Sequence, residues 1–182
     1  MNIMIVGVGG QGTLLASRIL GKVAIKEGYD VKVSEVHGMS QRGGSVVTYV
    51  KYGDKVYSPI IDRGEADLIL AFEMLEAMRA LPYLKKGGKM IANTQKMNPM
   101  PVITGAMEYP ENIEEKLSAK INLQAVDALS LAEKAGTIKA VNVVLIGLLA
   151  KSMDVDKNVW IDVIKETVPE KFLDVNIKAF EL

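Results

Sequence analysis

The residues best suited to bind a ligand lie in two short segments near the N-terminus. The first segment, GVGGQG, places Gly7, Gly9 and Gly12 in the spacing G-x-G-x-x-G. Glycines in this spacing let the backbone approach a phosphate, and the free N–H groups of the helix that follows attract negative charge. We expect a phosphate-bearing ligand here. The alternative is that these glycines only allow a tight turn between a strand and a helix.

The second segment, EVHGMSQRGG at residues 35–44, carries more hydrogen-bonding chemistry than closing a turn requires. Arg42 offers a planar fork for phosphate or carboxylate, and Gly43 and Gly44 allow backbone N–H groups to converge beside it. The polar side chains before Arg42 could bind a substrate carboxylate or a partner backbone. The candidate ligand-binding residues are therefore Gly7, Gly9, Gly10, Gln11, Gly12, His37, Ser40, Gln41, Arg42, Gly43 and Gly44.

Two other interpretations of these segments stay open. Arg42 could pair with Glu35 or Glu73 and simply hold the loop, and a lone histidine is more often structural than catalytic. A dinucleotide site would need an acidic residue about 20 residues beyond the glycines, and Glu35 meets that requirement formally. The bulk and polarity of VHGMSQRGG would crowd the place of an adenosine, so NAD binding is not favoured.

The elements that position these segments follow from apolar patterning. The continuous apolar run at 3–8 predicts a strand covered on both faces, and residues 13–27 have helical spacing. Residues 45–52 and 55–58 flank Gly53-Asp54 and predict a tight hairpin. The segment 97–112 is irregular apart from a short strand at Val102–Ile103. Further strands are expected at 31–36, 66–72, 89–94 and 121–126, and helices at 73–81, 128–135, 140–153 and 155–166.

This order of elements predicts an α/β, Rossmann-like sandwich with a mostly parallel sheet, an inserted β-hairpin and a C-terminal helical cluster. The length of 182 residues suits a single domain over residues 1–182. Positive and negative side chains balance at 22 each, which gives no field for nucleic acid or an anionic membrane. The longest apolar run, VVLIGLLA, is far shorter than the roughly 20 residues of a membrane span, so we expect a cytoplasmic protein.

Metal chemistry finds little support in the composition. The chain has no cysteine, the usual ligand of iron–sulfur clusters, and one histidine. We therefore expect no metal site and place any iron–sulfur cluster on another chain. No residue of this chain is expected to be catalytic by itself.

Three stretches together resemble one known family. GVGGQG, VHGMSQRGGSVVTYV and YSPII are similar to the gamma-type subunit or domain of the 2-oxoacid:ferredoxin oxidoreductases. The resemblance covers most of the chain, with its specific motifs in the first 65 residues. The form Met39-Ser40-Gln41 resembles the branch of that family that acts on indolepyruvate and other arylpyruvates.

The resemblance implies a reaction in which a 2-oxoacid, coenzyme A and oxidised ferredoxin give an acyl-CoA, carbon dioxide and reduced ferredoxin. It also implies that thiamine diphosphate and the iron–sulfur clusters belong to a larger alpha subunit, with ferredoxin an indirect partner. This chain would be the smaller subunit, inactive alone, which helps to form the coenzyme A or substrate site. A homodimer is left open. The alternatives are a gamma subunit for pyruvate or 2-oxoglutarate, a free-standing nucleotide-binding dehydrogenase, and a purely structural subunit.

Overall fold

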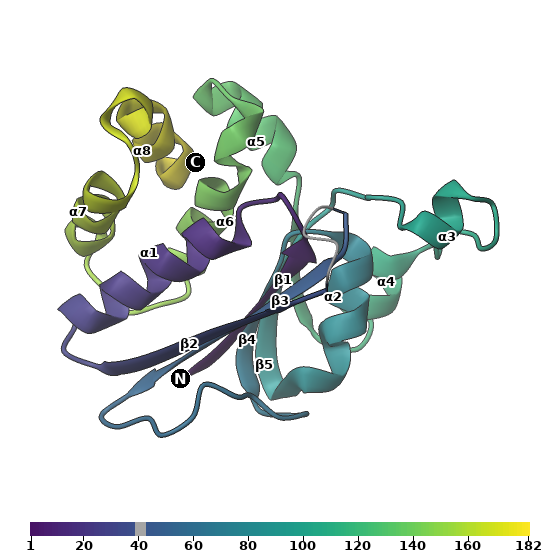
Figure 1. Ribbon diagram of the computed structural model, residues 1–182, viewed down its shortest axis with the longest axis horizontal. Coiled ribbons are helices and arrows are strands. Elements are labelled where there is room, and N and C mark those ends of the chain that lie inside the picture. The colour runs from purple at the N-terminus through teal and green to yellow at the C-terminus, as the bar shows by residue number, and fades with distance from the viewer. Residues whose placement is uncertain (39–42) are drawn as a thin grey trace.

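The computed structural model describes residues 1–38 and 43–182, and these form a six-stranded sheet with helices on both faces (Figure 1). The strands are β1 (Asn2–Val8), β2 (Asp30–His37), β3 (Ser45–Gly53), β4 (Ala66–Ala71), β5 (Leu84–Asn93) and β6 (Asn122–Val126). The α-helices are α1 (Thr13–Lys26), α2 (Met74–Ala80), α3 (Met100–Ile103), α4 (Ile113–Ser118), α5 (Ala128–Ala135), α6 (Val141–Ala150), α7 (Lys157–Thr167) and α8 (Leu173–Glu181). Short 3-10 turns are η1 (Leu81–Tyr83), η2 (Ile138–Ala140) and η3 (Glu170–Phe172).

The sheet is mostly parallel in strand direction, as predicted. Its order is β2-β3-β1-β4-β5-β6, and β1, β4, β5 and β6 pair in parallel along this order. Strand β3 pairs antiparallel with both β1 and β2, so β2 runs in the same direction as β1. The carboxyl ends of β1, β2, β4, β5 and β6 therefore meet at one edge, where α/β sheets place their ligands.

An inserted hairpin is present, but its arms differ from the predicted pair. Strand β3 is one arm, and its partner is β2 rather than residues 55–58. Residues 55–58 form no strand because both edges of β3 are already taken by β1 and β2. This segment is instead held at the sheet edge, where the Val56 amide donates to the Asp30 carboxylate at 2.9 Å.

Helices bury both faces of the sheet in two separate cores. Helices α1, α5, α6, α7 and α8 cover one face, and α2 and α4 cover the other (Figure 1). Trp160 and Phe180 stack in the larger core with ring centroids 6.1 Å apart. Helix α8, which the sequence analysis did not predict, packs so closely on α6 that Gly147 lies against the carbonyl group of Phe180.

The short strand predicted at Val102–Ile103 is wrong, because these residues end helix α3. Pro99 is the N-cap of this helix and Pro101 lies in its first turn. Proline has no N–H to pair in a sheet, yet its fixed φ suits the first turn of a helix. In Figure 1, α3 projects away from the sheet. None of the helices within 1–38 and 43–182 has the length and apolar character that crossing a membrane requires.

Alkaline pH is expected to destabilise the fold through Tyr52. Burial, followed by the nearby Tyr29 and Asp67, raises the pKa of Tyr52 from 10.0 to about 12. The contribution of Tyr52 is therefore complete below pH 10 and is lost as the pH rises towards 12. Between pH 9 and pH 11, the free energy of unfolding of the wild type should fall by about 1.4 kcal/mol more than that of the Tyr52→Phe variant.

Urea unfolding at the two pH values measures this difference. Tyr57→Phe is the control, because Tyr57 is the most exposed large apolar or aromatic side chain of the described residues at 85%. Equal pH dependence in the wild type and Tyr52→Phe would contradict the prediction.

Candidate functional site

The glycine loop between β1 and α1 has a backbone that requires glycine. Gly10 and Gly12 have φ values of 103° and 86°, a region that other residues rarely adopt. A Cβ on Gly12 would lie 2.6 Å from the side-chain nitrogen of Asn142 at the start of α6. A Cβ on Gly7 would lie 3.0 Å from the side chain of Phe72, which directly follows β4. The G-x-G-x-x-G spacing therefore allows close packing of α6 and β4 around the loop.

The two glycine-rich bends of the sequence lie side by side. The Gly9 amide donates to the Gly44 carbonyl at 2.8 Å, and the Gly43 amide donates to the Gly9 carbonyl at 3.3 Å. These bonds place the bends at the same edge of the sheet. They also occupy the N–H groups of Gly9 and Gly43, so a ligand would have to use other amides.

Gln11 bridges β1 and β4 where their backbone pairing stops. Its Oε1 accepts from the Val8 amide at 2.8 Å, and its Nε2 donates to the Phe72 carbonyl at 3.1 Å. The side-chain amide thereby satisfies the last groups of two neighbouring strands. This arrangement fixes the glycine loop onto the sheet and directs the polar atoms of Gln11 to protein groups.

The N-terminus of α1 opens onto a cavity of about 490 Å³, which we call the glycine cavity. The helix begins at Thr13 after its N-cap, Gly12, receives no side-chain cap from the described residues, and holds no acidic side chain in its first turn. Its first N–H groups and its dipole therefore favour an anion. Glu35 and His37 reach the same cavity from the end of β2. The lining residues are Gly9, Gly10, Gly12, Thr13, Leu14, Glu35, His37 and Val46.

A second cavity, of about 390 Å³, lies on the other side of the Gly43–Gly44 turn, and we call it the arm cavity. Its walls include this turn, helix α2 and the segment before α3. Two buried carboxylates, Glu73 and Glu76, lie in this wall with exposed fractions of 1% and 3%.

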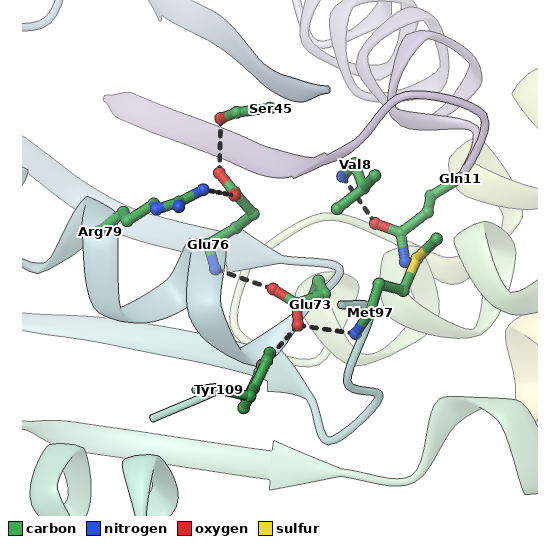
Figure 2. Close-up of polar contacts among 8 residues, drawn as sticks. All are labelled: Val8, Gln11, Ser45, Glu73, Glu76, Arg79, Met97 and Tyr109. Carbon is green, nitrogen blue, oxygen red and sulfur yellow. Dashed lines mark hydrogen bonds and ion pairs between the residues drawn. The ribbon is translucent and has the colours of Figure 1, made fainter. Parts of the chain in front are cut away.

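Both carboxylates are fully engaged in hydrogen bonds, as Figure 2 shows. Glu76 accepts from the Ser45 hydroxyl and from Arg79, each at 2.6 Å. Glu73 caps α2 by accepting from the Glu76 amide at 3.0 Å. Its other oxygen accepts from the Met97 amide at 3.0 Å and the Tyr109 hydroxyl at 2.5 Å. Burial and the bond to Glu73 raise the pKa of Tyr109 well above its ordinary value.

The structure gathers most of the described candidate residues at one edge of the sheet. His37 lines the glycine cavity and is exposed, and its Nδ1 lies 3.0 Å from the Gly38 carbonyl. Ser40, Gln41 and Arg42 lie outside the described residues. The possible pairing of Arg42 with Glu35 or Glu73 is therefore not tested.

Sequence reasoning missed several residues of this region. The glycine cavity also contains Thr13, Leu14 and Val46, which the pattern of polar residues did not single out. The pair Glu73 and Glu76, three residues apart directly after a buried strand, was the signal for the carboxylate cluster. Two carboxylates on one short helix that packs on a sheet need buried partners.

The fold and the site together define a Rossmann-like α/β protein. Its candidate ligand site lies at the carboxyl edge of the sheet, around a glycine-rich strand-to-helix turn. The chain belongs to the pyruvate ferredoxin/flavodoxin oxidoreductase family, whose model matches residues 2–182.

Similar proteins of this family differ in the substrates that their names give. The chain is 46% identical to the indolepyruvate oxidoreductase subunit IorB of Thermococcus kodakarensis, over 100% of this chain and 93% of that protein. It is 30% identical to the pyruvate/ketoisovalerate oxidoreductases common subunit gamma of the same organism, over 96% of this chain and 90% of that protein.

The fold is also similar to part of a longer solved chain. That chain is a 2-oxoglutarate:ferredoxin oxidoreductase from Magnetococcus marinus, solved with 2-oxoglutarate, coenzyme A and succinyl-CoA bound. The TM-score is 0.71 at 16% identity, over 100% of this chain and 30% of that chain. In that protein, the remaining chain is more than twice as long as the part that resembles this fold.

Proposed function

We propose that this chain is the smaller subunit of an indolepyruvate:ferredoxin oxidoreductase and that its glycine cavity helps to bind coenzyme A. The proposed reaction converts an arylpyruvate, coenzyme A and oxidised ferredoxin into an acyl-CoA, carbon dioxide and reduced ferredoxin. The assignment to indolepyruvate is supported by the 46% identity to an indolepyruvate oxidoreductase subunit, against 30% for a pyruvate/ketoisovalerate subunit.

The coenzyme A proposal depends chiefly on the start of α1 at the glycine cavity, because its first turn carries no acidic side chain and its N–H groups have no side-chain cap from the described residues. The carboxylate of Glu35, which also lines this cavity, comes from β2 and accepts from the Thr48 hydroxyl. Coenzyme A carries several phosphate groups, which helix N-termini and glycine turns bind well. Gly10 is open on the side where a Cβ would stand, because no described residue other than its chain neighbours comes within 4 Å of that position. Arg42, Ser40 and Gln41 are proposed as further contacts because of their side-chain chemistry and their place next to Gly43.

The residues of this chain do not fit the redox cofactors of the reaction. The sequence has no cysteine to hold an iron–sulfur cluster. We propose that the clusters and thiamine diphosphate belong to a larger partner subunit, which supplies the decarboxylation and electron transfer to ferredoxin. Coenzyme A, when bound, supplies the thiol that accepts the acyl group. The smaller subunit alone is expected to be inactive towards arylpyruvates.

Replacing Leu14 by glutamate in the assembled enzyme should raise the Kd for coenzyme A about tenfold, which corresponds to ~1.4 kcal/mol. Leu14 lines the glycine cavity in the first turn of α1 and is 46% exposed. A carboxylate there would repel the phosphates, whereas its effect on the helix itself is favourable. Isothermal titration with coenzyme A measures the change.

Ile25→Glu is the matched control for this experiment. Ile25 lies in the last turn of the same helix and is 62% exposed, remote from the glycine cavity. Its variant should bind coenzyme A as the wild type does. Unchanged coenzyme A affinity in an assembled Leu14→Glu enzyme would show that the glycine cavity does not bind coenzyme A.

One observation favours a nucleotide-dependent dehydrogenase as the second candidate. Glu35 lines the glycine cavity, where an acidic residue could accept hydrogen bonds from ribose hydroxyls. Its carboxylate already accepts from the Thr48 hydroxyl at 3.2 Å. Titration of the chain with NADH separates the two functions, because the proposed oxidoreductase subunit should show no tight binding.

A further inference from the structure

The segment between β5 and α4 forms a projecting arm, residues 97–109, and three of its large apolar side chains face solvent. Met100, Ile103 and Met107 are 65%, 64% and 65% exposed. Helix α3 carries the first two of them and stands clear of the sheet in Figure 1. Three large apolar side chains this exposed within eight residues mark an interaction surface rather than a packed loop.

The composition of the arm is that of an interface core. Residues 97–107 read MNPMPVITGAM and contain no charged side chain, although the whole chain is 24% charged. Charge depletion and enrichment in methionine distinguish the centre of protein interfaces from the rest of a surface. Flexible methionine side chains also adapt to the shape of an apolar groove.

A buried carboxylate holds the arm at its two ends. One oxygen of Glu73 accepts both from the Met97 amide at 3.0 Å and from the Tyr109 hydroxyl at 2.5 Å (Figure 2). Glu73 is itself 1% exposed and fixed as the cap of α2. Ordering the arm before association reduces the entropy lost on binding. The two hydrogen bonds to Glu73 are therefore suited to hold the arm in one conformation before a partner binds.

The inner side of the arm continues into the region proposed for the ligand. Met97, Met100 and Ile103 form one wall of the arm cavity, and the Gly43–Gly44 turn forms another. On its other side, this turn is bonded to Gly9 of the glycine cavity. A protein seated on the arm would therefore stand next to the proposed coenzyme A site.

We propose that the arm docks into an apolar groove of the larger subunit of the same oxidoreductase, with Met100, Ile103 and Met107 as its anchors. This inference rests on the proposed function, because that function supplies the larger subunit. The fold matches only 30% of the longer oxidoreductase chain that resembles it, so in that protein most of the chain lies outside the matching region. Docking on the arm would bring the larger subunit next to the proposed coenzyme A site.

Ile103→Glu should raise the Kd between the chain and the anaerobically purified larger subunit at least about 30-fold, the effect of losing an interface hot spot. Ile25→Glu introduces the same change at an equally exposed isoleucine of α1 and should alter the Kd less than about twofold. Both titrations omit coenzyme A and oxoacid, so failure of the coenzyme A proposal would not affect them. A wild-type Kd for Ile103→Glu, or equal losses for the two variants, would overturn the docking proposal.

Hydrogen exchange of the wild-type chain tests the arm without any substitution. Amides of residues 97–109 should exchange at least about tenfold more slowly in the assembled enzyme than in the free chain. Unchanged exchange on assembly would refute the proposal even if Ile103→Glu failed to fold. Protection that appears with increasing concentration of the chain alone would assign the arm to a second copy and would equally overturn it.

Discussion

Replacing Gly147 by alanine is expected to lower the free energy of unfolding by about 2 to 3 kcal/mol, the usual cost of overpacking a core. Gly147 lies in the buried helix α6. A Cβ at this position would overlap the carbonyl oxygen of Phe180 and lie 3.0 Å from its carbonyl carbon. Since these are backbone atoms of α8, no side chain can move aside. The two helices must separate, and this loss exceeds the gain of about 1 kcal/mol in helix propensity.

Gly21→Ala is the matched control and should have the opposite sign. Gly21 is also a buried glycine within a helix, α1, but its Cβ would lie 3.6 Å from the Val33 side chain, an ordinary contact. The variant should gain about 0.5 to 1 kcal/mol. Urea unfolding of both variants measures the pair. A Gly147→Ala protein as stable as the wild type would show that α6 and α8 do not pack this closely.

Removing the carboxylate of Glu73 should have the largest effect of all, a loss of about 3 to 5 kcal/mol for Glu73→Ala. Three donors lose their acceptor at once, namely the amides of Glu76 and Met97 and the hydroxyl of Tyr109. Each buried group left unpaired costs about 1 to 3 kcal/mol. The arm would lose its hydrogen bonds to Glu73 at both ends, so its amides should also exchange with solvent faster than in the wild type.

Two further variants divide this effect into its parts. Tyr109→Phe removes one bond to the Glu73 carboxylate and should cost about 1.5 to 3 kcal/mol. Glu108→Ala changes the exposed neighbour of Tyr109 and should stay within about 0.5 kcal/mol of the wild type. Calorimetric unfolding of the set gives the comparison. If Glu73→Ala cost no more than Tyr109→Phe, the carboxylate would not hold both ends of the arm.

The close pairing of Gly9 with Gly44 links the proposed site to the proposed docking surface. The glycine cavity lies on the α1 side of the Gly43–Gly44 turn, and the arm cavity lies on the α2 side. The turn lines the arm cavity, and its hydrogen bonds to Gly9 join it to the lining of the glycine cavity. A shift of the turn would therefore act on the glycine cavity through Gly9. Assembly on the arm and ligand binding at α1 are therefore expected to influence one another.

The sequence by itself determined the fold class, the family and the two glycine-rich segments of the candidate site. The apolar runs of β1 and β4 and the helical spacing of α1 and α7 are local patterns, and these patterns follow from burial on one or both faces of an element. The glycine spacing is likewise a local pattern, because a tight turn requires glycine at positions set by the neighbouring residues of the chain.

Only the tertiary structure decided which elements meet. The partner of β3 was mispredicted because strand pairing depends on which sheet edges are free, and β2 occupies the edge of β3 that residues 55–58 would need. The roles of Gln11 and Glu73 also depend on distant partners, since Phe72 and Tyr109 lie 61 and 36 residues away from them. Hydrogen bonds across such separations leave no periodic trace in a sequence, and they exist only once the sheet has brought the two segments together.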